Sequence, residues 1–255
     1  MKISVITATY NSGATLRDTI ESVVSQDYPD FEHLIIDGGS TDNTIDIIKE
    51  YEPKYGDRLK WISEPDKGIY DAMNKGIKMA TGDVIGILNS DDFYFSSHTL
   101  SHISRAIQEK DITFGDLQFV TPEDTTKVVR LWKGSPFIKG AFLKGWHPAH
   151  PTFYARKKCF DEMGDFDIDF KISADFELMF RFLEKGNYSC SYIPETLVSM
   201  RLGGESTKSV KNIVQGNRFV LKAFKKNGFQ VPKLYLIRRL GPKGFQLLKH
   251  KMHLI

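Results

Sequence analysis

The sequence predicts an α/β fold in which an open, mixed but mostly parallel sheet carries helices on both faces. Short apolar runs suited to buried strands alternate with amphipathic segments of helical period in the first part of the chain. The breaks between them are short, as in units where a helix crosses over to the next parallel strand. With 255 residues, 41% hydrophobic and 26% charged, the chain can bury one large core.

The first strand and helix are predicted over residues 3–8 and 15–26. ISVITA is a continuous apolar run, typical of a parallel strand covered on both faces. Leu16, Ile20 and Val23 fall on one face of the following segment, which indicates an amphipathic helix. The polar stretch between the two elements therefore lies at the carboxyl end of the strand.

The same alternation continues to a fourth strand. FEHLIID breaks at two glycines, LKWISE is stopped by a proline, and DVIGIL ends in the polar run NSDD. We expect strands over residues 31–37, 59–64 and 83–88, and helices over 44–51 and 69–80.

The second half of the chain is less regular. Amphipathic segments predict two more helices, and β-rich runs predict three strands around a loop rich in Gly, Pro and aromatic residues at 135–151. We expect these helices over residues 97–108 and 174–186, and the strands over 112–120, 126–132 and 188–193.

Polar side chains follow all four parallel strands at the point where each strand ends. Ligands of open parallel sheets bind at that edge. We therefore expect a site that includes Tyr10, Asn11, Asp37 and residues 64–67 and 89–92. The carboxylate of Asp37 can accept a hydrogen bond from a base or a ribose, or it can cap the next helix. The GGST turn after it lacks the GxGxxG spacing of a dinucleotide-binding loop.

Asp91 and Asp92 place two adjacent carboxylates beside a buried strand, where like charges repel and burial is costly. One interpretation is a solvated turn. The other is a site for Mg²⁺ or Mn²⁺, which proteins hold with one or two carboxylates, completed by substrate phosphates and water.

The second half of the chain offers further candidates for catalysis and binding. Asp175 and Glu177 begin a predicted helix, where a carboxylate can act as a general base or only complement the helix dipole. His147 and His150 lie in a proline-containing loop that can contact an acceptor, and Arg201 can neutralise a diphosphate. For each of these last three, an ordinary surface residue is the plainer interpretation.

Cysteine usage and hydropathy favour a cytoplasmic protein. Cys159 and Cys190 form no CxxC pattern, so neither a zinc site nor a disulfide framework is indicated. The N-terminal apolar run is too short for a signal peptide, and no run of about 18 apolar residues could span a membrane.

The charge distribution is uneven. Residues 206–255 carry 12 Lys and Arg and no Asp or Glu, which leaves 23 basic and 32 acidic residues before them, a net charge of −9. Basic residues mixed with Phe, Leu, Ile and Tyr suit a helical surface on the inner face of the cytoplasmic membrane. Nucleic acid is the other polyanion to consider and a solvated helical tail is the plain alternative. We favour the membrane and expect no nucleic-acid partner.

Several of these segments together resemble the family 2 glycosyltransferases, in particular bacterial sugar transferases of polysaccharide and cell-envelope assembly. They are VITATYNSGATLRDTIESVVSQ, FEHLIIDGGSTDNT, EPDKGIYDAMNKGIKMATGDVIGILNSDD and SADFELMFR. The resemblance implies a GT-A fold and transfer of a sugar from a nucleotide sugar, which we expect to be a UDP-sugar, with inversion at the anomeric carbon. We expect a GT-A domain over 1–206, with a nucleotide-binding half at 1–95 and an acceptor half at 96–206, then a basic amphipathic segment over 207–255.

The resemblance also implies roles for individual residues. Contacts with the base and nucleoside fall on Thr7, Ala8, Tyr10, Asn11 and Asp37. Contacts with the diphosphate region fall on Asp66, Lys67, Tyr70, Asp71 and Asn74.

The family's metal motif, Asp-x-Asp with another Asp often following, reads Asn89, Ser90, Asp91, Asp92 in this sequence. We expect Asp92 to bind Mn²⁺ or Mg²⁺ and Asp91 to lie nearer the ribose or the waters of the metal. An amide in place of the first acid departs from the family pattern and weakens the case for strict metal dependence.

SADFE matches the family's Glu-Asp pair with Ala174 and Asp175, which makes Asp175 the general base. The implied acceptor is a glycan or a lipid-linked saccharide. Lys67 or Arg201 would help the metal to neutralise the leaving diphosphate.

Two other functions remain open from the sequence. A sugar-phosphate nucleotidyltransferase usually carries a basic Gly-rich loop near its N-terminus, and TATYNSGAT contains no basic residue. A non-catalytic module that binds nucleotide sugars or membranes would keep the fold without turnover.

Overall fold

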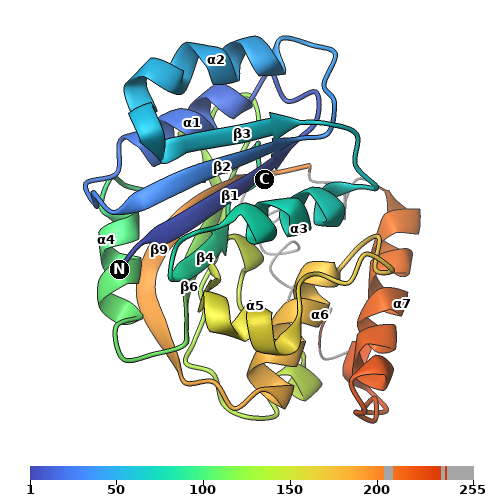
Figure 1. The fold of residues 1–255 in the computed structure, drawn as a ribbon. Helices are drawn as coiled ribbons and strands as arrows, with labels where there is room; N and C mark the ends of the chain where they lie inside the picture. The colour runs from blue at the N-terminus through green and yellow to red at the C-terminus, as the bar shows by residue number, and fades with distance from the viewer. Residues whose placement is uncertain (204–208, 237–238, 240–255) are drawn as a thin grey trace.

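A computed structural model describes residues 1–203, 209–236 and 239 of the chain and shows one mixed sheet flanked by helices (Figure 1). The strand order is β3-β2-β1-β4-β8-β6-β9-β5, and β7 pairs with β6. The predicted α/β fold is confirmed.

The first four strands in this order are parallel and alternate along the chain with three helices, as the sequence predicted. The strands are β1 (Ile3–Thr9), β2 (Phe31–Asp37), β3 (Leu59–Ser63) and β4 (Val84–Ile87). The helices are α1 (Leu16–Val24), α2 (Thr44–Tyr55) and α3 (Ile69–Met79), with a short helical turn η1 (Gly56–Arg58) after α2.

The second half of the chain extends this sheet. β8 runs antiparallel to β4 and β6, β9 runs parallel to β6, and β5 and β7 are antiparallel to their neighbours. These strands are β5 (Phe93–Tyr94), β6 (Ile112–Val120), β7 (Val128–Trp132), β8 (Tyr154–Arg156) and β9 (Cys190–Arg201). The helical elements are α4 (Thr99–Ala106), η2 (Phe142–Lys144), η3 (His150–Thr152), α5 (Lys157–Met163), α6 (Ala174–Phe180), η4 (Arg181–Lys185) and α7 (Val210–Lys226).

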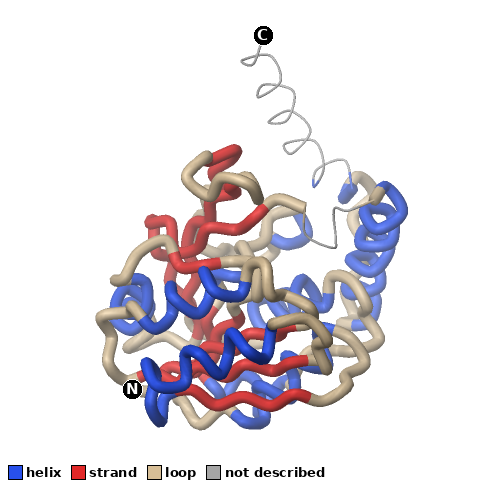
Figure 2. Tube along the Cα trace, turned by 90° about the horizontal axis from the view of Figure 1, so that it is seen from above, coloured by secondary structure: helices blue, strands red, loops and turns tan. Residues whose placement is uncertain are grey.

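Side chains alternate between two cores along the parallel strands, because successive residues of a strand face opposite sides. On β1, Ile3 and Val5 pack in one core with residues of α1 and α2, whereas Ile6 and Ala8 pack in the other with residues of α3. Figure 2 shows helices running alongside the strands near the N-terminus. Both faces of the sheet are therefore covered, which explains the continuous apolar runs.

The sequence missed short elements and the length of β9. β5, β8 and α5 have two, three and seven residues, which is too few for a clear period. The strand predicted at 188–193 runs on to Arg201, although Pro194 marks a natural end. Irregular pairing with β6 around Gly115 and Asp116 accommodates the extra length.

The segment after residue 209 packs onto the sheet domain. On α7, Val220, Ala223 and Phe224 are fully buried, and the rings of Phe224 and Phe180 lie 4.8 Å apart. Part of the apolar surface that we predicted to face a membrane is thus used for packing. The predicted domain boundary at residue 206 stays a prediction. The last part of the predicted basic segment, residues 240–255, falls outside the described residues. Among the helices described, none is long and apolar enough to cross a membrane.

Gly76 lets α3 approach the sheet closely. A Cβ at this position would lie 2.4 Å from Cγ2 of Ile6, inside β1. Gly216 on α7 is the useful contrast, because a Cβ there would meet Ile172 and Ser173 at an ordinary 3.4 Å. Both glycines lie within helices.

We expect Gly76→Ala to destabilise the fold and Gly216→Ala to leave it unchanged or more stable. Alanine gains about 1 kcal/mol of helix propensity at either site, but overpacking at Gly76 costs about 1–3 kcal/mol more than a tolerated substitution. Thermal unfolding should show Gly76→Ala melting below Gly216→Ala by several degrees. Equal melting temperatures would contradict the close approach of α3.

Candidate functional site

The carboxyl ends of three parallel strands are in register. Thr9, Asp37 and Ser63 are direct neighbours across β1, β2 and β3. The Gly38 amide donates to the Thr9 carbonyl at 2.9 Å, and the Glu64 amide donates to the Asp37 carbonyl at 3.0 Å. The loops therefore leave the sheet side by side, at the edge where the sequence predicted a site.

Asp37 organises the loop after β2. Its buried carboxylate accepts hydrogen bonds from the backbone amides of Gly39 (3.0 Å) and Ser40 (2.9 Å). The hydroxyls of Ser40 and Ser63 also donate to it, the latter at 2.6 Å. Asp37 thus ties its own loop to β3, and its predicted contact with a nucleoside stays a prediction.

The loop after β1 lies against the loop after β2. Asn11 has a φ of 48°, a left-handed conformation that Asn tolerates better than most residues. The backbone N–H of Asn11 donates to Oγ of Ser40 at 2.7 Å. Its side-chain oxygen Oδ1 accepts from the backbone N–H of Thr41 at 2.9 Å. Tyr10 is 62% exposed, and a Cβ on Gly38 would lie 3.4 Å from its ring. Tyr10 and Asn11 therefore lie at the predicted edge.

Thr7 and Ala8 both precede the end of β1, and their side chains are buried. Oγ1 of Thr7 lies 2.9 Å from Nε2 of His33, inside the core beneath the sheet. Burial lowers the pKa of His33 to about 3, so this ring is neutral. Ala8 packs in the core that contains α3. The predicted contact of these two residues with a nucleotide stays a prediction.

The two carboxylates after β4 are unequal. Asp92 is fully buried, with Oδ2 accepting from Nδ2 of Asn89 at 2.9 Å and Oδ1 without a hydrogen-bond partner. The hydroxyl of Thr19 on α1 donates to the Asp92 carbonyl at 2.7 Å. Asp91 is partly exposed. The side-chain amide of Asn89 can donate to Asp92, which an ionised aspartate at position 89 could not do.

Burial raises the pKa of both carboxyl groups. For Asp92 the rise is large and the charge of Asp91 adds to it, while for Asp91 its own backbone and Arg201 oppose the rise. An unpartnered buried oxygen beside a partly exposed carboxylate fits a divalent cation. Within the described ranges, no three His, Cys, Asp or Glu side chains gather to hold a metal ion. Phosphates and water would therefore complete its shell.

Arg201, at the end of β9, braces this turn. It is 6% exposed, and one terminal nitrogen donates to the Asp91 carbonyl at 2.6 Å. The other forms an ion pair with Asp18 of α1, and the guanidinium lies over the ring of Phe93 at 5.2 Å. The structure thus places Arg201 beside the acidic pair, and both terminal nitrogens of its guanidinium bind oxygen atoms of the protein.

The turn before α3 lies beside the loop after β2. Oδ1 of Asp66 accepts from the Gly68 amide at 2.7 Å, and Oδ2 of Asp71 accepts from the Lys67 amide at 3.0 Å. A Cβ on Gly38 would lie 2.4 Å from Oδ2 of Asp66, so the two segments are in close contact. Lys67 is exposed. These residues share the predicted edge, and their contact with a diphosphate stays a prediction.

Asp175 begins α6 and lies beside α3. The hydroxyl of Tyr70 donates to Oδ1 of Asp175 at 3.2 Å. Burial lowers the pKa of His150, and the charge of Asp175 opposes this effect, which places the two groups near each other. The rings of Tyr70 and His150 both contact Phe166, with centroids 5.5 and 6.0 Å away. Tyr70, His150 and Asp175 therefore form one group, although the sequence assigned them to different parts of the site.

The short turn η3 connects this group to the acidic pair. η3 begins at His150 and contacts both β4 and α6. β4 ends at Ile87, four residues before Asp91, and α6 carries Asp175. The strand that precedes the predicted metal ligands and the helix that carries the predicted base thus contact a common element.

His147 occupies a packing position. Its ring lies edge-on to Trp132 and Phe176, with centroids 5.0 and 5.5 Å away. Its Nδ1 lies 3.0 Å from the Pro148 carbonyl. The two histidines of the loop therefore differ, because His150 reaches the surroundings of Asp175 and His147 lies among aromatic rings.

A network that fixes α6 was missed by the sequence analysis. Glu177 is 1% exposed and pairs with Arg181 at 3.1 Å, while Nδ2 of Asn227 donates to its Oε1 at 2.9 Å. Arg181 also donates to main-chain carbonyls of residues 163–165. The spacing of four between Glu177 and Arg181 could have indicated the pair. No sequence signal connects Asn227 to it.

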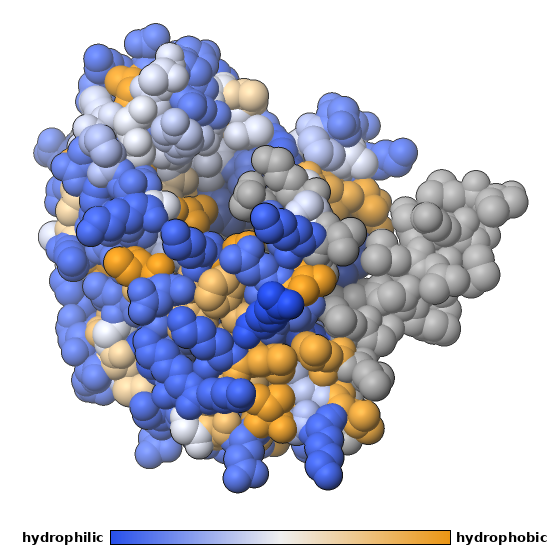
Figure 3. Space-filling view, turned by 90° about the vertical axis from the view of Figure 1, so that its right-hand side faces the viewer, coloured by the Kyte–Doolittle hydropathy of each residue, from blue (hydrophilic) through white to orange (hydrophobic). Residues whose placement is uncertain are grey.

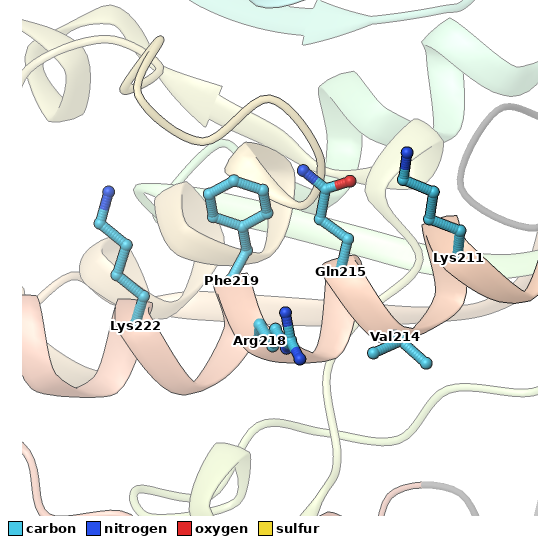
Figure 4. Close-up of a pocket in the computed structure, with 6 residues that line it drawn as sticks. All are labelled: Lys211, Val214, Gln215, Arg218, Phe219 and Lys222. Carbon is cyan, nitrogen blue, oxygen red and sulfur yellow. The ribbon is translucent and has the colours of Figure 1, made fainter.

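The outer face of α7 is basic and hollowed. A hollow of about 630 Å³ is lined by Lys211, Val214, Gln215, Arg218, Phe219 and Lys222 (Figure 4). Val214 is 47% exposed. Figure 3, which faces this side of the molecule, shows apolar patches among hydrophilic side chains. The face thus combines cations with exposed apolar groups.

Comparisons with known proteins identify the family of this chain. The model of glycosyl transferase family 2 matches residues 4–165. A PGL/p-HBAD biosynthesis glycosyltransferase of Mycobacterium bovis is 30% identical over 181 residues, which cover 70% of this chain and 68% of the relative.

Two solved structures share the fold at low sequence identity. TarS 1–349 of S. aureus in complex with UDP-GlcNAc has a TM-score of 0.68 and 19% identity, covering 94% of this chain and 73% of that one. A longer TarS chain is covered over only 44% of its length. The mannosyltransferase PcManGT of Pyrobaculum calidifontis, in complex with GDP-Man and Mn²⁺, has a TM-score of 0.65 and 20% identity, covering 97% and 70%.

The family match spans the four parallel strands and the acidic pair, and the structural neighbours share the fold over most of the chain. The chain therefore belongs to glycosyl transferase family 2 and has the GT-A fold.

Proposed function

We propose that this protein transfers a sugar, with inversion, from a nucleotide sugar to a hydroxyl group of a glycan or a lipid-linked saccharide in polysaccharide biosynthesis. The observation that carries the proposal is that η3 contacts both β4 and α6. The acidic pair follows the end of β4, and α6 carries Asp175, so η3 links the two candidate sites. Such an arrangement can hold a leaving diphosphate and a general base on opposite sides of one reacting carbon.

The donor would lie over the ends of β1, β2 and β3. Tyr10 is exposed there for contact with a base, and Asn11 and Asp37 shape the two loops beneath it. We favour a UDP-sugar because TarS, of similar fold, was solved with UDP-GlcNAc. PcManGT was solved with GDP-Man, so guanosine is the alternative to test.

Asp91 and Asp92 would hold a divalent metal ion. The sequence favoured Asp92 as the main ligand, and its unpartnered Oδ1 supports a place for it in the site. Because Asp92 is fully buried and Asp91 partly exposed, we assign the outward contact to Asp91 and the inner one to Asp92. When bound, the ion neutralises the charge that develops on the leaving diphosphate.

Asp175 would act as the base in a single displacement. The acceptor hydroxyl gives its proton to the free oxygen of Asp175 while its own oxygen forms the bond to the anomeric carbon. The bond from that carbon to the diphosphate oxygen breaks, and the electron pair leaves with the nucleoside diphosphate. Attack from the side opposite the leaving group inverts the anomeric centre.

The C-terminal basic face would contact an anionic membrane surface, where a lipid-linked acceptor is presented. On α7, Lys211, Arg218 and Lys222 are exposed around the hollow, and Val214 is exposed between them. Basic residues near an anionic leaflet contribute about 1 kcal/mol each. We further propose a location on the inner face of the cytoplasmic membrane.

We expect Asp175→Asn to retain nucleotide binding and to lose turnover about 10²- to 10⁴-fold, because the amide cannot accept the proton. Release of nucleoside diphosphate from UDP-glucose, UDP-GlcNAc and GDP-mannose measures this without knowledge of the acceptor, since water can take its place. Asp169→Asn, at an exposed position before α6, is the matched control. Unchanged release by Asp175→Asn would refute the base role, and loss of catalysis without loss of binding would exclude a non-catalytic module.

We expect Asp91→Asn and Asp92→Asn each to raise the Mn²⁺ concentration for half-maximal turnover at least about tenfold, since each removes one of two carboxylate ligands. Titration of Mn²⁺ in the same release assay measures this, again with Asp169→Asn as the control. A larger effect at Asp91 supports the outward assignment. Identical metal dependence of both variants and the parent protein would contradict the site.

We expect the full chain to sediment with phosphatidylglycerol vesicles at low salt and less so at high salt, because screening weakens surface charges. Reversing two charges in Lys211→Glu/Arg218→Glu should lower vesicle affinity about thirtyfold or more. Lys49→Glu/Lys185→Glu makes the same charge change at other exposed sites and should lower it far less. Equal losses in the two double variants would count against a specific role for α7.

A further inference from the structure

Tyr70 joins α3 to the first turn of α6. Its hydroxyl donates to Oδ1 of Asp175 at 3.2 Å, across 105 residues of sequence. The phenol oxygen also faces the backbone N–H groups of Ala174 and Asp175. The hydroxyl is therefore placed between the carboxylate and the helix end that carries it.

The ring of Tyr70 is held by Phe166, and Phe166 is held by Asn74. The rings of Tyr70 and Phe166 are stacked, with centroids 5.5 Å apart and planes 29° apart. Nδ2 of Asn74 donates to the Phe166 carbonyl at 2.8 Å, and Oδ1 of Asn74 accepts from the Phe166 amide at 2.9 Å. Both ends of the Asn74 amide are thus bonded to the main chain of one residue.

These contacts give Tyr70 and Asn74 a different role from the one that the resemblance implied. We propose that Tyr70 positions Asp175 and that Asn74 positions Tyr70 through Phe166, so that both residues act on the base and neither binds the diphosphate. The proposal rests on the role of Asp175 as the base in the proposed function.

Tyr70 acts on Asp175 as a hydrogen-bond donor, because its hydroxyl stays protonated. Burial, with the charge of Asp175 next, raises the pKa of Tyr70 well above its usual value, so the hydroxyl remains a donor. A donor to a carboxylate stabilises its ionised form. It also occupies Oδ1 and leaves the other oxygen for the acceptor proton.

Other titratable or charged groups lie around the start of α6. His150 lies on the η3 side, where burial lowers its pKa and keeps the ring neutral near pH 7. On the C-terminal side, Arg239 lies 4.8 Å from the ring centre of Phe176, the residue after the base. Neither is altered by a change at Tyr70, so the shift caused by losing its hydroxyl can be measured separately.

Tyr70→Phe tests the proposal because it keeps the stacked ring and removes only the donor. The assay is the pH dependence of nucleoside diphosphate release from the most active of the three nucleotide sugars. We expect the acidic limb of kcat to move up by about one pH unit and kcat at pH 7 to fall about tenfold or more. The KM for the donor should stay within about twofold, since uniform binding is unaffected.

Tyr188→Phe is the matched control. Its hydroxyl donates to Oε2 of Glu162 at 2.7 Å, so the change also removes a bond from tyrosine to a carboxylate, but outside the site. It should leave the pH profile unchanged. Asn74→Ala should move the acidic limb in the same direction as Tyr70→Phe by a smaller amount, with unchanged affinity for UDP in calorimetry.

Two results separate this inference from the proposed function. If Asp175→Asn is inactive but Tyr70→Phe keeps the parent pH profile, the positioning role is wrong while the base role stands. If Tyr70→Phe and Asn74→Ala raise the donor KM and weaken UDP binding with no shift of the acidic limb, the two residues serve the nucleotide and the inference is overturned. If Asp175→Asn remains active, the proposed function itself fails.

Discussion

The in-register ends of β1, β2 and β3 are the constraint on which the site depends. A slip of one residue would turn every side chain of a strand to the opposite face, so the two-sided core fixes the register and the register fixes the loops. The other end of the sheet is pinned as well, by the buried carboxylate of Glu32 between Lys2 (2.8 Å) and Lys60 (3.2 Å). Burial alone would raise the pKa of Glu32, yet hydrogen bonds from Lys2, Thr81 and Ser4 lower it to about 2. Glu32 therefore stays ionised and paired below its ordinary titration range. Its contribution to stability is complete above the ordinary pKa of 4.5 and is lost progressively as the pH falls toward 2.

The buried carboxylates at the two ends of the sheet differ in whether the protein supplies partners for them. Glu32 has its cations and hydrogen-bond donors within the protein, whereas Asp91 and Asp92 share a buried turn in which an oxygen of Asp92 lacks a partner. Burying such a pair is costly, and the divalent cation that we propose there would offset the repulsion between the two carboxylates. Asp175, the proposed base, already accepts a hydrogen bond from Tyr70 within the protein. The proposed metal site therefore lacks a partner that the proposed base already has.

Much of the fold could be predicted because the first four strands are buried on both faces and separated by short loops. The polar strand ends predicted one edge correctly, since Tyr10, Asn11, Asp66 and the acidic pair all lie at loops after parallel strands. The interior positions of Thr7 and Ala8 were not evident, because a motif marks a loop without showing where the strand ends. The link from Tyr70 to Asp175 could not be predicted either, because its partners lie 105 residues apart and are joined only by the packing of α3 on α6. Likewise, composition identified the basic C-terminal segment but not that α7 turns Val220 and Phe224 into the core.

The most direct test of the nucleotide-sugar site is isothermal titration calorimetry of the full chain with UDP and with GDP, each with and without Mn²⁺. A site made of one buried carboxylate, one partly exposed carboxylate and a set of loops should bind a nucleoside diphosphate weakly alone and at least about tenfold more tightly with the metal. We predict this behaviour for UDP, with weaker binding of GDP. If neither nucleotide binds, with or without Mn²⁺, the edge of the sheet is not a donor site and the proposed transfer reaction is wrong.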